Sequence, residues 1–288
     1  MSTFRDKLKV KLATVEDLPT LPSILTELER LLHSESSGVA EIALVIEEDP
    51  GIAGGVLRVA NSVMFYSSMS GTIVSVRDAI VRLGLKEVGQ LVSSAALIRT
   101  FKTTGSHLNP KRFWRRSLCT AVAGRVIARA ARSSKSFAEE EAYMAGLLHD
   151  LGFLILDQYF PDDYEQLHAA FESKGADSAD IERDILGIDH GEIGGYLLDL
   201  WNLPMPLVHA VTWHNQPENA VPETRLLTET VRTSELITEI LEAENAADER
   251  MQTLLDRELW AELCIPTEDV ASIVAETKKD STPVFALV

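Results

Sequence analysis

The stretch AGLLHDLG, residues 145–152, places a histidine and an aspartate side by side within an apolar run of helical character. Burial of charged groups is costly unless they are paired or bound to a metal. Adjacent His149 and Asp150 can offer an imidazole nitrogen and a carboxylate oxygen to one divalent ion, as in hydrolytic metal sites. The alternative is that the two side chains satisfy each other, or the backbone, inside a helical core. The dipeptide alone does not discriminate between a metal site and a structural pair.

Outward from this stretch, almost every segment has a helical period and strand alternation is nearly absent, which predicts an all-α protein. Long helices are expected over residues 109–131 and 222–246, and residues 137–159 form a helix, or a broken pair of helices, that carries the HD pair. Asp49-Pro50 is typical of a helix start. Asn61 and Gly84 are typical of helix ends, where either residue can adopt the left-handed conformation. The alternative for Asn61 is that it bridges the two lobes by hydrogen bonds.

Composition limits the class of protein. The chain has 288 residues, of which 45% are hydrophobic and 25% charged, as in ordinary globular proteins. No apolar run approaches the roughly 18 residues of a membrane helix, and the N-terminus lacks signal-peptide features. We therefore expect a cytoplasmic protein without membrane contact. Cys119 and Cys264 are far apart and predict free thiols. The net charge of −17 opposes direct nucleic-acid binding.

Several short motifs occur in a fixed order along the chain. They are LP at 18–19 and 21–22, EDP at 48–50, LRVANS at 57–62, the helix 75–84 with AI and LG, FW at 113–114, LLHDLG at 147–152, DH at 189–190 with Gly194, WNLP at 201–204 and His214. In their order and spacing the chain resembles the HDOD family, bacterial output-domain relatives of the HD hydrolase superfamily, over about residues 14–240. The resemblance implies an all-α fold with an N-terminal helical bundle packed on a C-terminal HD-like helical lobe.

We divide the chain accordingly into three segments. These are an N-terminal helical lobe over residues 1–108, an HD-like helical lobe over 109–246 and a C-terminal helical extension over 247–288. The Ser/Met-rich stretch 62–71 is predicted to be a loop, and 103–107 a linker. The extension either caps the core or serves regulation or dimerisation, and its last residues are expected to fray.

The resemblance also identifies where this chain departs from the hydrolases. Catalytic members of the superfamily bind metal through a histidine on the helix before HD, the HD pair and a late aspartate. The cyclic-dinucleotide phosphodiesterase branch adds further histidines. Here the first histidine corresponds to Arg116, which cannot ligate a metal. The late aspartate corresponds to Ser234, a poor ligand, with Glu235 beside it. The paired histidines of relatives correspond to His214-Asn215. The ligands that remain are His149, Asp150, His190 and His214.

Without a metal, a buried Asp150 needs a cation or several hydrogen-bond donors. We hypothesise that the guanidinium of Arg116 pairs with Asp150 where an ion would otherwise lie. The alternative is that Arg116 is solvated on its helix surface. His190 lies near a helix start and His214 near a helix end, so each either lines a shared pocket with His149 or serves the local structure.

Two functions compete on this evidence. The first is a non-catalytic signal-transduction or regulatory module, a pseudo-enzyme, that binds a protein partner or a small ligand such as a nucleotide and needs no cofactor. The missing first histidine and late aspartate favour it. The alternative is a metal-dependent phosphohydrolase acting on a nucleotide or cyclic dinucleotide. Its ion (Mn, Fe or Mg) would be held by the reduced set His149, Asp150, His190 and His214.

Overall fold

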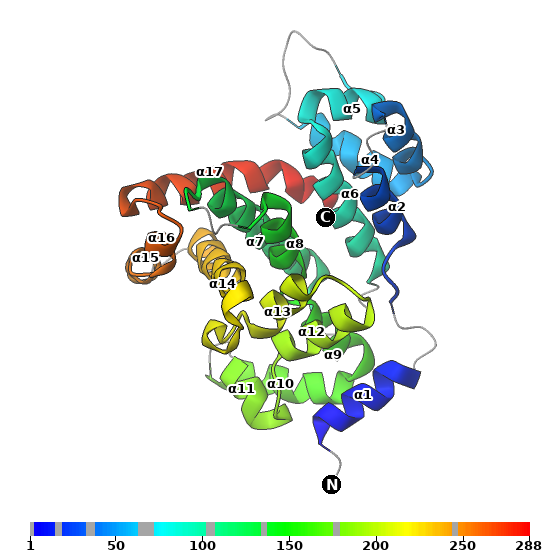
Figure 1. The fold of residues 1–288 in the computed structure, drawn as a ribbon. Coiled ribbons are helices and arrows are strands. Elements are labelled where there is room, and N and C mark those ends of the chain that lie inside the picture. Colours follow the sequence, from blue (N-terminus) through cyan, green and yellow to red (C-terminus); the bar gives the residue numbers. More distant parts are fainter. Residues whose placement is uncertain are drawn as a thin grey trace. The chain divides into compact units, whose positions relative to one another are not determined.

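The computed structural model describes residues 3–14, 19–32, 38–62, 72–101, 107–133, 137–174, 179–243 and 247–288. Within these ranges all regular structure is helical and no strand occurs, which confirms the predicted all-α class (Figure 1). None of the helices described has both the length and the apolar character needed to cross a membrane. Most of the predicted loop (63–71) and of the predicted linker (103–106) lies outside the described residues.

The chain forms two compact units. Unit 1 comprises Met1–Leu18 and Lys102–Thr277, and unit 2 comprises Pro19–Phe101 and Lys278–Val288. This grouping differs from the three predicted segments at both ends of the chain, because the first helix belongs with the later helices and the last residues belong with the early ones. The three-segment division into domains stays a prediction.

Unit 2 is a small helical bundle. Its elements are α2 (Ser23–Leu32), α3 (Val39–Glu47), α4 (Pro50–Ala60), α5 (Val76–Leu83), α6 (Leu85–Thr100), the end of α17 and η3 (Phe285–Leu287). The Asp49 carboxylate accepts hydrogen bonds from the amides of Gly51 and Ile52, and Pro50 takes the first helical position, as predicted. Gly84 ends α5 with a φ of 90°, a value that glycine adopts without strain.

Two predictions about segment ends were wrong. Asn61 ends α4 as predicted, but its φ of −95° is not left-handed, and its side chain is hydrogen-bonded instead. Its amide donates to the carbonyl oxygens of Leu57 and Ile73, and its Oδ1 accepts from the Ile73 amide. The last residues do not fray, since α17 and η3 extend through them and Arg58 Nε donates to the Ala286 carbonyl at 3.2 Å.

Unit 1 holds the remaining helices. They are α1 (Phe4–Thr14), α7 (Pro110–Ala130), α8 (Glu139–Leu148), α9 (Leu151–Tyr159), α10 (Pro161–Lys174), α11 (Ala179–Leu186), α12 (His190–Leu200), α13 (Met205–Trp213), η1 (Pro217–Asn219), α14 (Pro222–Glu242), α15 (Ala247–Leu255), α16 (Leu259–Glu262), η2 (Thr267–Asp269) and the first part of α17 (Val270–Val284). Apolar side chains from α7, α8, α13 and α14, four of them alanines, form a core cluster. It consists of Ala128, Ala142, Ala145, Leu207, Ala210, Leu227 and Val231.

The predicted helix over 137–159 is a broken pair, and the break falls at the HD dipeptide. Helix α8 ends at Leu148 and α9 begins at Leu151, so His149 and Asp150 form the turn between them. Asp150 has φ −94° and ψ 5°, and its carbonyl accepts the first hydrogen bond of α9, from Phe153. Both functional side chains therefore come from a short turn fixed by a helix on either side.

Gly152 allows α9 to approach the start of α12. A Cβ at this position would lie 2.0 Å from the His190 carbonyl oxygen, so the backbone would have to move. We expect Gly152→Ala to lower the free energy of unfolding by about 1–3 kcal/mol through overpacking. In the control Gly54→Ala the nearest atom to the new Cβ is 3.7 Å away, and that variant should be neutral or more stable. Urea unfolding followed by circular dichroism measures both, and equal effects would contradict the prediction.

Candidate histidine and carboxylate site

Four of the residues singled out in the sequence meet inside unit 1. His149 and Asp150 come from the turn between α8 and α9, His190 opens α12, and His214 directly follows α13. His149 and His214 are 0% exposed, and Asp150 and His190 are 5% exposed. Polar groups at this depth are hydrogen-bonded in most proteins. The contacts of these four side chains therefore determine what the site can do.

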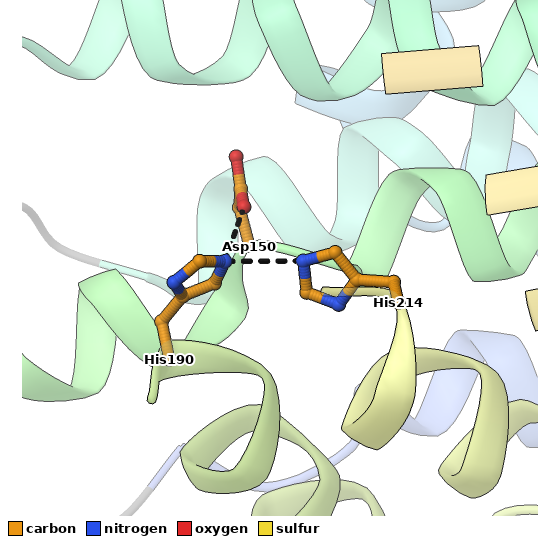
Figure 2. Close-up of side chains that lie close together, drawn as sticks. All are labelled: Asp150, His190 and His214. Atoms are coloured by element: carbon orange, nitrogen blue, oxygen red, sulfur yellow. Dashed lines mark hydrogen bonds and ion pairs between the residues drawn. The ribbon is translucent and has the colours of Figure 1, made fainter. Parts of the chain in front are cut away.

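Asp150, His190 and His214 form a corner in which three side chains converge (Figure 2). His190 Nε2 lies 3.2 Å from Asp150 Oδ1 and 3.1 Å from His214 Nε2. One ligand atom from each residue lies within 4.8 Å of the other two, so the three could hold a metal ion. The Asn215 amide, predicted at the position of the second paired histidine, lies 3.2 Å from His190 Nε2 and reaches the same corner.

The Nδ1 atom of each histidine is already engaged away from the corner. In His149 and His214, Nδ1 lies 2.8 and 2.7 Å from the backbone carbonyl oxygen three residues earlier. Each of these two rings donates from Nδ1, so Nε2 is the ring nitrogen that remains on the side of the corner. His190 Nδ1 lies 2.9 Å from both carboxylate oxygens of Glu182. Outer hydrogen bonds of this kind orient the imidazole ligands of metal sites.

Glu182 is a site residue that the sequence analysis missed. Its side chain in α11 is fully buried, and its Oε2 also accepts a hydrogen bond from the His190 backbone amide at 2.5 Å. Glu182 therefore fixes both the backbone and the ring of His190. The available signal was its spacing, four residues before the buried Leu186, because glutamate on the apolar face of a helix is unusual.

The corner is strongly polarised. Burial disfavours a charged His190, but the carboxylates of Glu182 and Asp150 outweigh this and raise its pKa well above the ordinary value. Burial would raise the pKa of Asp150, but His149 and His190 hold it well below its usual range. Burial and the neighbouring charge of His190 lower the pKa of His214 to about 4. In the metal-free protein at neutral pH, His190 therefore carries a proton on Nε2, between Asp150 and a neutral His214.

Arg116, on α7, lies on the other side of Asp150. Its Nε is 3.9 Å from Asp150 Oδ2, and its Nη2 is 3.0 Å from Glu235 Oε1. Glu239 and Glu242, on the same helix as Glu235, pair with the guanidinium at 3.5 and 3.4 Å. The Arg116 side chain is 25% exposed, and its closest carboxylate is Glu235, not the Asp150 of our hypothesis. Arg116 thus supplies one positive charge to four carboxylates.

Ser234, which the resemblance predicts at the position of the late aspartate, is engaged by its own helix. It is fully buried, and its hydroxyl donates to the Thr230 carbonyl at 2.7 Å. The next residue, Glu235, contacts Arg116 instead and also pairs with Arg232 at 2.6 Å. Burial would raise the pKa of Glu235, but Arg232 and His149 lower it to about 2. An ionised Glu235 therefore holds Arg116 beside Asp150.

Comparison with known proteins identifies the family to which this helical fold belongs. The model of the HDOD domain family matches residues 18–217. This chain belongs to the HDOD family. The match includes the HD pair, His190 and His214, so the corner lies within the HDOD domain.

Solved structures of similar proteins share the HDOD fold. A candidate phosphohydrolase from Shewanella amazonensis is 25% identical, with a TM-score of 0.76 and coverage of 96% of this chain and 98% of that protein. An HDOD domain protein from Geobacter sulfurreducens is 21% identical, with a TM-score of 0.78 and coverage of 94% and 96%.

An uncharacterised protein of Treponema pallidum is 25% identical over 241 residues, 84% of this chain and 46% of that protein. The chain thus spans about half the length of this curated relative.

The HDOD corner fits a single divalent cation. His149 Nε2 lies 3.2 Å from Asp150 Oδ2 without hydrogen-bond alignment, and no described residue bonds to it, although it is buried. Asp150, His190 and His214 would hold the ion, with His149 nearby, and an ion there would supply a Lewis acid and an activated water. Binding would require His190 to lose its Nε2 proton. On the Oδ2 side of Asp150 the residues do not fit a second ion, because Arg116 brings a positive charge within 3.9 Å.

Proposed function

We propose that this HDOD protein is a non-catalytic regulatory module that acts by binding a protein partner or a small ligand. The observation that carries the proposal is the position of Arg116. The resemblance predicts the first metal ligand of the HD hydrolases at this residue, and its guanidinium lies 3.0 Å from Glu235 and 3.9 Å from Asp150. A fixed cation there compensates the carboxylates and, unlike a metal, has no open coordination position for water or phosphate.

Burial and charge support the same proposal. A phosphohydrolase must admit a phosphoester to its ion, yet His149, Asp150, His190 and His214 are at most 5% exposed. Transfer of a phosphoryl group also needs positive charge directed at the developing negative charge. Arg116 is already held by four carboxylates, so it is a poor phosphate ligand.

A reduced phosphohydrolase is the second candidate, and the orientation of the imidazoles favours it. The Nδ1 atoms of His149 and His214 are tied to backbone carbonyls, and that of His190 to Glu182, as in metal centres. An ion bound to Asp150, His190 and His214 would lower the pKa of a coordinated water and thereby supply a nucleophile.

Metal content together with hydrolysis separates the two candidates. Tag-free protein is purified without chelators, soaked in Mn²⁺ or Fe²⁺, desalted and analysed by elemental mass spectrometry, and then assayed on bis(p-nitrophenyl) phosphate and on cyclic dinucleotides. We expect no turnover above that of Asp150→Asn, with the exposed Asp184→Asn of α11 as the control. A tightly held ion with turnover that is lost in Asp150→Asn, but kept in Asp184→Asn, would overturn the proposal.

A further inference from the structure

A groove in unit 1 lies between α1, α12 and α13. Its volume is about 340 Å³, and α1 contributes Arg5, Leu8 and Lys9 to its wall. The opposite walls include Asp199 of α12 and Met205 of α13. The groove therefore lies between a helix from the start of the chain and two helices that follow the HD pair by some 40 residues or more.

Helix α1 is attached through a single apolar stripe. Phe4, Leu8 and Leu12, spaced four residues apart, are buried, whereas Val10 between them is 65% exposed. The Phe4 ring lies against the Phe160 ring, with centroids 5.1 Å apart. Figure 1 shows α1 as a peripheral helix of unit 1. An isolated helix of 11 residues is marginal in water, so α1 depends on this docking for its helical structure.

The charge of α1 is opposite to that of the chain. Between Phe4 and Thr14 there are four basic residues and one acidic residue, in a chain with a net charge of −17. Arg5 forms an ion pair with Glu192 of α12, and Asp199, two turns further along α12, lines the same groove. The acidic side chains of α12 thus complement a basic helix.

One apolar side chain of the groove stays exposed beside the docked α1. Met205 lines it and is still 50% exposed, while Val208, one turn later on α13, is 6% exposed. An occupant with an apolar stripe longer than that of α1 would cover Met205 as well.

We propose that the α12–α13 groove is a docking surface for a basic amphipathic helix of a partner protein, and that α1 is its built-in competitor. The inference rests on the proposed function, since it names the kind of partner that a regulatory module with this surface binds. Helix α1 itself defines the chemistry of the occupant: apolar residues at intervals of four, with lysine or arginine between them. Because α1 is tethered, it lowers the apparent affinity for any partner until it is displaced.

The test uses the full chain and a fluorescent peptide with the sequence of residues 3–14. Leu8→Asp removes α1 from the groove, and Val10→Asp, on the exposed face of the same helix, is the matched control. By fluorescence anisotropy we expect the Leu8→Asp protein to bind the peptide at least tenfold more tightly than the wild type or Val10→Asp. Adding Asp199→Lys to Leu8→Asp should weaken binding again, and so should raised salt.

The outcomes are distinct. Equal binding by Leu8→Asp and Val10→Asp, or no binding by a Leu8→Asp protein with wild-type circular dichroism outside α1, would overturn the inference. A wild-type dimer that Leu8→Asp dissociates would also overturn it, because the occupant would then be a second copy of the chain. Failure of the proposed function would appear separately, as metal-dependent hydrolysis, which does not involve the groove.

Discussion

Arg116→Met is expected to lower the free energy of unfolding by about 3–5 kcal/mol, the usual cost of removing one partner of a buried ion pair. The physical reason is that Arg116 compensates the charge of buried carboxylates. Asp150 and Glu235 are both buried, and both lie within 4 Å of the guanidinium. Methionine keeps much of the side-chain volume, so the loss is mainly of charge.

The measurement is urea unfolding by circular dichroism and tryptophan fluorescence, with Arg112→Met as the control, because Arg112 is exposed on the same helix. The control should change stability by less than about 0.5 kcal/mol. Divalent cations provide a second readout. If Arg116 stands in for a metal, Mn²⁺ should stabilise Arg116→Met more than the wild type. A loss below about 1 kcal/mol, or the same loss in Arg112→Met, would show that Arg116 is only a solvated surface residue.

Glu182→Ala is expected to cost a comparable amount, about 3–5 kcal/mol, because it leaves the charged His190 buried with fewer partners. Glu182 accepts hydrogen bonds from both the backbone amide and Nδ1 of His190. Alanine would leave both donors without their acceptor. The exposed Asp184→Ala, on the same helix, serves as the control.

Glu182→Gln separates charge from shape. Glutamine keeps an acceptor but removes the negative charge that raises the pKa of His190, so that pKa should fall. A titration of the imidazole nitrogens of metal-free protein by ¹⁵N NMR measures this fall. Because the pKa of His190 is raised in the folded state, its contribution to stability is complete below its ordinary pKa of 6.5 and is lost as the pH rises through the raised value. Glu182→Gln should reduce this dependence, and an unchanged His190 pKa would exclude Glu182 as its positioning residue.

The sequence by itself determined the local features of this protein. The helix starts at Asp49-Pro50 and after Asn109, the helix end at Gly84, and the candidate break within 137–159 all follow from residues within one or two turns of each other. Caps, prolines and apolar periodicity act over that range. The order of the motifs was also enough to indicate the HDOD family, and hence which residues to compare with metal ligands.

Only the tertiary structure decided which of these residues meet. Arg116 and Glu235 are 119 positions apart, and His190 and His214 are 24 apart, yet each pair is in contact. The spacing of Glu182 marks it as unusual, but its contact with His190 appears only when α11 is placed beside that residue. Likewise, the sequences of α1 and of the last residues do not indicate which of the two units each segment belongs to. Such contacts depend on how helix faces pack. The amphipathic pattern of a helix shows which face is buried, but it does not specify the helix that covers this face.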